Sequence, residues 1–184
     1  MFASNELAKE GCGVKAVLHG TFPAWPLSVF LLGCGPLPQS AVEFRAAVKD
    51  GAFMTTETSF EVERPWQEVG QTFQEQAEKC LKVNVATASM TNQSYQHIVS
   101  RYHPTVVIGS SRAELHIQRK HTSGAIGVRK EPADGHYLVV ADASPLDKGR
   151  TRIDIFGPAM GSNSLVDAIK SWTAGENLDC PMLE

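Results

Sequence analysis

The chain has 184 residues, of which 42% are hydrophobic and 20% are charged, and its formal net charge is −3. This apolar content is enough for one ordinary buried core, and the acidic balance argues against nucleic-acid binding as the main task. After residue 34, no apolar run approaches the length of a transmembrane helix.

The first distinctive stretch is the apolar run of residues 16–33, which ends in Leu31-Leu32-Gly33-Cys34. A short basic start, an apolar segment too short to span a bilayer comfortably and a small residue before a cysteine are typical of a bacterial lipoprotein signal. The sequence therefore predicts a signal peptide at residues 1–33 and a lipid anchor on Cys34. Gly35 follows where an aspartate would retain a lipoprotein in the inner membrane, so we expect an outer-membrane lipoprotein that faces the periplasm.

Two features of this region fit a signal peptide less well. Glu6 and Glu10 are unusual in a segment that should be basic, which would be explained if residues 1–13 were a gene-start error. Pro23 and Pro26 interrupt the apolar run. The alternative is a buried segment of a cytosolic domain, but the two prolines also count against an unbroken helix or strand.

The four cysteines, Cys12, Cys34, Cys80 and Cys180, fit the same interpretation. Processing would remove Cys12 and the lipid would occupy Cys34, which leaves Cys80 and Cys180 to pair with each other. An oxidising periplasm would allow this disulfide bond, which would close a loop of about 100 residues. The alternative is two buried free thiols, which are common in cytosolic proteins.

The chain after the anchor begins with a tether at residues 34–38 and a short helix at residues 41–49, capped by Ser40. Residues 52–63 alternate between the two faces expected of a half-buried strand. Residues 66–81 repeat apolar side chains at helical spacing and give the clearest helix.

Residues 82–94 are ambiguous, because two valines could start a strand while most of the remainder resembles a loop. Residues 95–102 and 105–108 predict a strand that is interrupted at Pro104. Further strands and a last helix follow, at residues 114–120, 126–128, 137–143, 151–156 and 163–173.

The order of these elements is strand, helix, several antiparallel strands and helix, which predicts an α+β fold. We expect a single domain at residues 39–184, built as an antiparallel β-sheet with two main α-helices packed on one face. Cys80 and Cys180 lie at or just after the ends of the two long helices, so their disulfide bond would pin these helices together.

Several short segments between Phe44 and Leu81 and near the C-terminus carry a resemblance to a known family. They are Phe44-Arg45-Ala46-Ala47-Val48, Gly51-Ala52-Phe53, Phe60-Glu61-Val62-Glu63-Arg64-Pro65, Cys80-Leu81, Ile169-Lys170-Ser171-Trp172, Gly175 and Cys180-Pro181. In these segments the chain resembles an uncharacterised family of proteobacterial envelope lipoproteins. The resemblance implies a lipid-anchored periplasmic domain and carries no catalytic motif.

Catalytic and metal-ligating patterns are weak in this sequence. Ser110-Ser111 follows a glycine but forms no nucleophile elbow, so a hydrolase is the least favoured class. The histidines do not form a metal-binding pattern and are interpreted as solvated residues of the sheet, with no metal and no cofactor. They are His97, His103, His116, His121 and His136.

Two further segments could contact ligands. Gly161, Ser162 and Asn163 lead into a helix N-terminus, whose free amides could hold a phosphate or carboxylate, although a plain connection is the simpler interpretation. A band of basic residues could face anionic headgroups or peptidoglycan, although a solvated face is the simpler interpretation here too. Its members are Arg112, Arg119, Lys120, Arg129 and Lys130.

The leading functional hypothesis is a lipid-anchored envelope lipoprotein that acts as a binding or structural module without catalysis. Its expected partners are the membrane, through the lipid, and another envelope protein or peptidoglycan, but not nucleic acid. A small-ligand binding protein with a pocket between sheet and helices is the alternative. A concave apolar pocket there would favour the alternative, whereas a filled core would favour the leading hypothesis.

Overall fold

The computed structural model describes residues 37–91, 94–123, 132–176 and 179–183, and all of them belong to one compact unit. The predicted signal peptide at residues 1–33, the anchor residue Cys34 and the start of the tether lie outside the described residues. Among the helices that are described, none combines the length and apolar character needed to cross a membrane.

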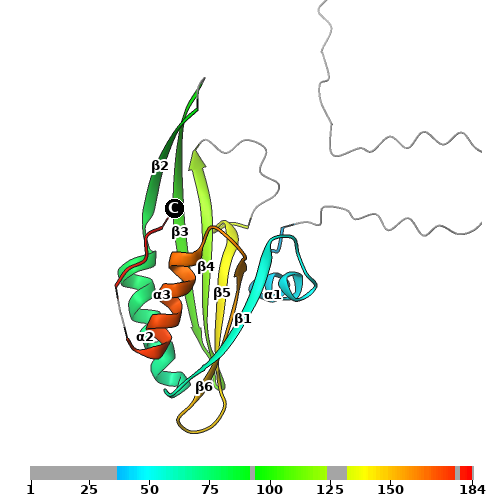
Figure 1. Ribbon diagram of the computed structural model, residues 1–184, viewed down its shortest axis with the longest axis vertical. Coiled ribbons are helices and arrows are strands. Elements are labelled where there is room, and N and C mark those ends of the chain that lie inside the picture. The colour runs from blue at the N-terminus through cyan, green and yellow to red at the C-terminus, as the bar shows by residue number, and fades with distance from the viewer. Residues whose placement is uncertain (1–36, 92–93, 124–131, 177–178, 184) are drawn as a thin grey trace, which may run out of the picture. The chain divides into compact units, whose positions relative to one another are not determined.

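The described unit is built on one six-stranded antiparallel sheet, in the order β1-β6-β5-β4-β3-β2 (Figure 1). Among the described strands, the first therefore pairs with the last, while β2 to β6 follow one another as neighbours. The strands are β1 at Thr55–Val62, β2 at Asn84–Thr91, β3 at Ser94–Ile108, β4 at Ala113–Ser123, β5 at His136–Pro145 and β6 at Thr151–Pro158.

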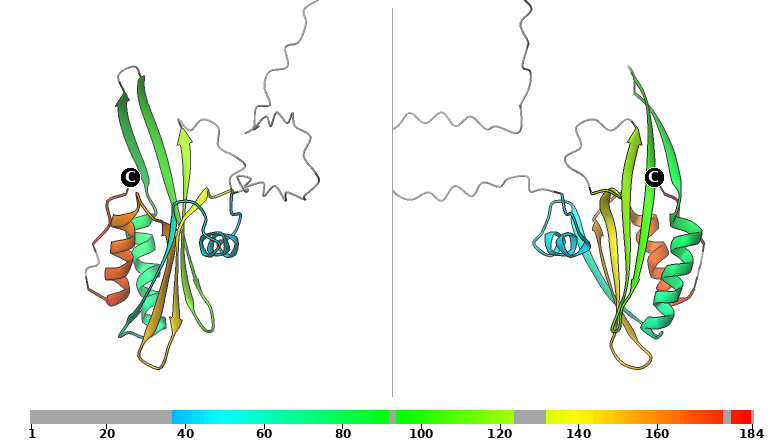
Figure 2. Two further views of the ribbon diagram at one scale, coloured as in Figure 1. Left: turned by 45° about the vertical axis from the view of Figure 1, so that its right-hand side comes forward. Right: turned by 180° about the vertical axis from the view of Figure 1, so that it is seen from behind.

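The helices lie on both faces of this sheet. Helix α2 (Trp66–Gln76), its π-helical continuation η1 (Ala77–Leu81) and α3 (Asn163–Ala174) cover one face, and α1 (Ala41–Lys49) lies on the other (Figure 2). The predicted α+β fold, with two main helices on one face of an antiparallel sheet, is confirmed. The position of the short helix α1 on the opposite face was not predicted.

The main core lies between the sheet and the pair α2 and α3, where apolar residues at helical spacing meet the inward residues of the strands. Phe73, Leu81 and Trp172 are fully buried there. Gly70 allows α2 to approach the sheet closely, because a Cβ atom at this position would lie 2.8 Å from the Cβ of Ala113.

A second, smaller core holds α1 on the opposite face. Ala41, Phe44 and Val48 recur along one side of α1 and are buried against Val140 and Phe156 of the sheet. The hydroxyl of Ser40 accepts a hydrogen bond from the N–H of Glu43, which caps the helix as the sequence predicts.

The predicted disulfide bond between Cys80 and Cys180 is present, with the two Cα atoms 5.1 Å apart. It joins η1 to the C-terminal tail, residues 179–183. The indole N–H of Trp172 donates to the carbonyl of Asp179 at 3.2 Å, and the hydroxyl of Ser164 donates to the carbonyl of Met182 at 2.6 Å. Because Ser164 lies in the first turn of α3, the tail runs back along this helix.

Two features of the middle of the chain differ from the prediction. The ambiguous segment at residues 82–94 contributes strand β2, and the predicted break at Pro104 is wrong because β3 continues through it. The N–H of Tyr102 donates to Val83 at 3.0 Å, so the nitrogen of Pro104, two residues later, faces the same side. Strand β2 begins only at Asn84, so Pro104 interrupts no ladder hydrogen bond.

Candidate functional site

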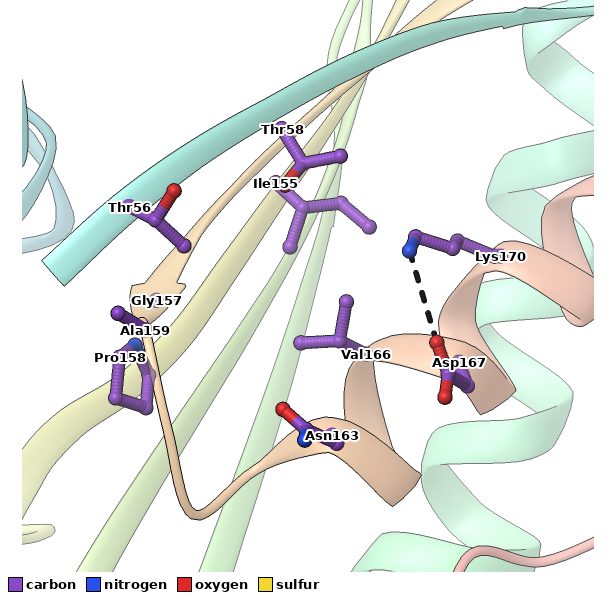
Figure 3. Close-up of a pocket in the computed structure, with 10 residues that line it drawn as sticks. All are labelled: Thr56, Thr58, Ile155, Gly157, Pro158, Ala159, Asn163, Val166, Asp167 and Lys170. Atoms are coloured by element: carbon purple, nitrogen blue, oxygen red, sulfur yellow. Dashed lines mark ion pairs between the residues drawn. The ribbon is translucent and has the colours of Figure 1, made fainter.

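A groove runs between the edge strand β1 and helix α3 (Figure 3). It consists of two adjoining cavities of about 310 Å³ and 470 Å³, which share Thr58 and Lys170 in their walls. The first cavity lies toward Asn163 at the start of α3, and the second extends toward Glu176 just beyond its end.

The groove exists because α3 covers β1 incompletely. Every second residue of β1 faces the side of the sheet that carries α3. Val62 is buried, Phe60 and Thr58 are half-buried, and Thr56 is exposed, so the cover decreases toward the start of the strand. A strip of the inner sheet face, formed by Thr56, Thr58 and Phe60, is therefore accessible beside α3.

The charged residues in the walls of the groove are mostly acidic. Lys170 lies 3.6 Å from Asp167, and the side chains meet across one turn of α3 (Figure 3). Glu176 lines the second cavity, whereas the side chain of Glu61 at its edge lies on the opposite face of β1, so two carboxylates and one ammonium group face the groove. A basic or apolar ligand fits these walls better than an anion does.

Exposed apolar side chains gather at one end of the groove. Phe53 is 90% exposed, Met160 is 63% exposed and Met54 is 46% exposed, and we call these three residues the apolar lip. Met54 has a φ of 58°, which a residue with a side chain seldom adopts, and its carbonyl accepts from the N–H of Ala159 at 2.8 Å. Ala159 also lines the groove, so lip and groove adjoin.

The predicted anion site only partly coincides with this groove. Asn163 lines the first cavity, whereas Ser162 is buried and Gly161 lies in an exposed turn with a φ of +81°. Asp167 faces the same cavity one turn further along α3 and would repel an anion there (Figure 3). Anion binding at these three residues stays a prediction, and this carboxylate counts against it.

The described members of the predicted basic band do not form one surface. Arg112 precedes β4 and Lys120 lies near its other end, so about 25 Å of strand separates them. Arg112 is already paired with Glu114 at 2.7 Å. Arg129 and Lys130 lie outside the described residues.

A charge cluster that was not predicted lies where α1 meets the sheet. Arg45 of α1 forms ion pairs with Glu114 of β4 and Asp142 of β5, and His116 donates to Glu114 at 2.8 Å. Burial alone would raise the pKa of Glu114, but hydrogen bonds from His116 and Arg45 and the charges of Arg45 and Arg112 lower this pKa to about 2. The cluster stabilises the docking of α1 and leaves no free ligand-binding carboxylate.

The histidines occupy several different environments. His97 is exposed, as predicted, but the side chain of His116 is only 14% exposed and belongs to the charge cluster. His121 and His136 pack together, with 5.6 Å between their ring centroids. Among the described residues, no three His, Cys, Asp or Glu side chains come together in an arrangement that could hold a metal ion.

The structure brings together one serine and histidine pair that the sequence did not reveal. The hydroxyl of Ser100 lies 3.0 Å from Nδ1 of His121, a distance suitable for a nucleophile and its base. Ser100 is only 3% exposed, however, so a substrate carbonyl could not reach its oxygen. Ser110 and Ser111, which were considered in the sequence, lie exposed in the turn between β3 and β4.

No protein-family model matches the chain, and no curated protein matches it. The resemblance to envelope lipoproteins therefore stays a prediction from the residues that carry it.

Proposed function

We propose that this protein is a lipid-anchored envelope lipoprotein that binds another envelope protein in the groove between β1 and α3, without catalysis. The anchor would be Cys34, in the outer membrane and facing the periplasm. The domain that follows would present the groove and the apolar lip to its partner.

The groove carries this proposal. An uncovered strip of β1 beside the exposed apolar side chains of Phe53, Met54 and Met160 is unusual on a protein that acts alone, because exposed apolar surface of this kind is ordinarily buried against a partner. The disulfide bond between Cys80 and Cys180 supports an oxidising compartment such as the periplasm. The filled core between the sheet and the helices favours a binding or structural module over a ligand carrier.

A small molecule is the second candidate, and the cavity of about 310 Å³ beside Asn163 favours it. This volume lies at the lower end of the range for small-molecule pockets. Peptidoglycan is less favoured as a ligand of the groove, because its own carboxylates would meet Asp167 and Glu176.

Site-specific photo-crosslinking in living cells of the native host tests the proposed function. A photoreactive residue at Thr58 would sit inside the groove, and the same residue at Gln71, exposed on α2, is the matched control. We expect one discrete protein adduct from Thr58 and none from Gln71. Equal adducts at both positions, or none at Thr58, would contradict a protein partner in the groove.

A further inference from the structure

The free edge of β1 offers hydrogen-bonding groups to an additional strand. Among the described strands β1 has one neighbour, β6, and the bond from Ala159 N–H to the carbonyl of Met54 marks a bonded position of this antiparallel pair. Bonded positions recur at every second residue, so the residues between them turn their N–H and C=O groups away from β6. These residues are Glu57, Ser59 and Glu61.

The other places where strand edges are open are less suited to a partner. Strand β3 lacks the β2 ladder beyond Arg101, but Pro104 faces that side and has no N–H to donate. Strand β2 carries no charged residue between Asn84 and Thr91, so its side chains cannot select a partner by charge.

A strand added beside β1 would direct every second side chain toward the groove. Phe60 and Thr58 are half-buried on that side, and Val166 of α3 completes the apolar wall. Apolar side chains on the incoming strand would cover this surface, and one near its end would contact Phe53 or Met160 of the apolar lip.

The remaining side chains of an added strand, which point away from the groove, would lie beside acidic residues of β1. Glu57 and Glu61 are exposed on the outer face of β1, and Glu61 lies 3.2 Å from Arg150. A second copy of this chain that paired antiparallel about Ser59 would set Glu57 against the partner's Glu61, and like charges at such positions destabilise a strand pair. Basic side chains at these positions would instead be attracted, most strongly by Glu57, because Glu61 is already paired with Arg150 and lies opposite Arg152 of β6.

We propose that the partner binds through an extended segment that adds a strand to β1 and alternates apolar with basic side chains. This inference rests on the proposed function and specifies its mode of recognition. Main-chain hydrogen bonds to Glu57, Ser59 and Glu61 would supply affinity. The apolar groove on one face and the two carboxylates on the other would select the sequence.

A synthetic peptide as long as β1, with alternating lysine and valine, is the probe. Its binding to the protein without the signal region is measured by fluorescence anisotropy, beside a peptide of alternating glutamate and valine. We expect the lysine peptide to bind at least about tenfold more tightly at low salt, with a difference that shrinks as salt screens the charges. Glu57→Lys should reduce this preference, and equal binding of both peptides would overturn the charge selection.

Proline at Ser59 tests the backbone pairing. Ser59→Pro removes an N–H that faces away from β6 and should therefore keep the β1–β6 ladder, while Ser59→Ala is the matched control that keeps this N–H. Both variants lose the hydrogen bond from Ser59 to Asp154. We expect Ser59→Pro to weaken lysine-peptide binding by about tenfold and Ser59→Ala to leave it nearly unchanged. Equal binding by two folded variants would overturn strand addition.

Hydrogen exchange on the unmodified protein gives a second readout that does not depend on the fold of a variant. The lysine peptide should slow exchange of the amides of Glu57, Ser59 and Glu61, and unchanged rates at saturation would contradict pairing with β1. The experiments distinguish a failure of strand addition from a failure of the proposed function. If Thr58 forms a protein adduct in cells but the lysine peptide neither binds preferentially nor slows amide exchange, the groove remains a protein-binding site and strand addition is rejected.

Discussion

Glu114 and Asp142 lie directly opposite one another on the adjacent strands β4 and β5, and Arg45 of helix α1 pairs with both carboxylates. Two like charges at facing positions of an antiparallel pair destabilise it unless a cation lies between them. Helix α1 supplies that cation from outside the sheet. Its docking therefore depends on charge as well as on the apolar contacts of Phe44 and Val48.

Arg45→Met should destabilise the domain by about 3–5 kcal/mol, because it leaves the largely buried Asp142 without its counter-ion and removes one of the cations that pair with Glu114. Arg152→Met is the control, since Arg152 is 53% exposed and pairs with Asp154 at the surface. That change should cost less than about 1 kcal/mol. Urea denaturation measures both variants, and equal effects would show that the charge cluster does not hold α1.

The acid dependence of stability should also depend on Glu114. Its pKa is lowered to about 2 in the folded protein from an ordinary value of 4.5, so the unfolded chain binds more protons between these values. Stability from this group is fully present above about pH 4.5 and is lost as the pH falls through about 2. The difference in unfolding free energy between the wild type and Glu114→Gln should shrink over that window. A constant difference would contradict the lowered pKa.

Replacement of both disulfide cysteines, Cys80→Ser with Cys180→Ser, should reduce the unfolding free energy by up to about 4–5 kcal/mol, because the bond closes a loop of about 100 residues. Limited proteolysis should then cut the tail at residues 179–183 before the rest of the domain. A tail that stays protected without the bond would show that the hydrogen bonds from Trp172 and Ser164 suffice to hold it.

Trp172→Ala should cost about 3–5 kcal/mol, because the indole is fully buried between α3 and the sheet and its N–H donates to Asp179. Met182→Ala is the control, since Met182 is 84% exposed and should contribute little. Thermal and urea denaturation of both variants check the prediction. A cost below about 1 kcal/mol for Trp172→Ala would mean that the cavity collapses without loss.

Cys34→Ser should move the protein from the membrane fraction to the soluble periplasmic fraction of the native host. The thiol would be the attachment point of the lipid, and a serine hydroxyl cannot replace it in that modification. Fractionation followed by immunoblotting measures the change, and Gly35→Asp tests the expected outer-membrane location by shifting the protein to the inner membrane. Native protein recovered from the soluble fraction with residues 1–33 intact would contradict the predicted anchor.

Helices and strands with a regular local pattern were predictable from the sequence. The helical spacing at residues 66–81 and the alternation at residues 151–156 correspond to α2 with η1 and to β6. Pro104 was misjudged because its effect depends on which side of β3 lacks a neighbour, and this is a property of the sheet rather than of the local sequence.

The groove and the charge cluster could not be predicted in the same way. Lys170 and Thr58 are 112 positions apart in the printed sequence and meet only because β1 pairs with β6, which precedes α3. Arg45 lies on a short helix between apolar residues, and nothing in the local sequence distinguished it from a solvated residue. The sequence predicts a strand that contains Glu114. That Glu114 faces Asp142 follows only from the register in which β4 pairs with β5, which the sequence does not show.

The pairing of β1 with β6 also determines the order in which the domain can assemble. Strand β1 leaves the ribosome or a translocation channel early, but its ladder partner, residues 151–158, emerges almost last. The neighbouring strands β2 to β5 can pair progressively through short connections, whereas β1 must wait for a contact between distant parts of the chain. The nascent chain therefore remains incompletely folded until nearly all of it has emerged, and until then the unpaired β1 segment is exposed to aggregation.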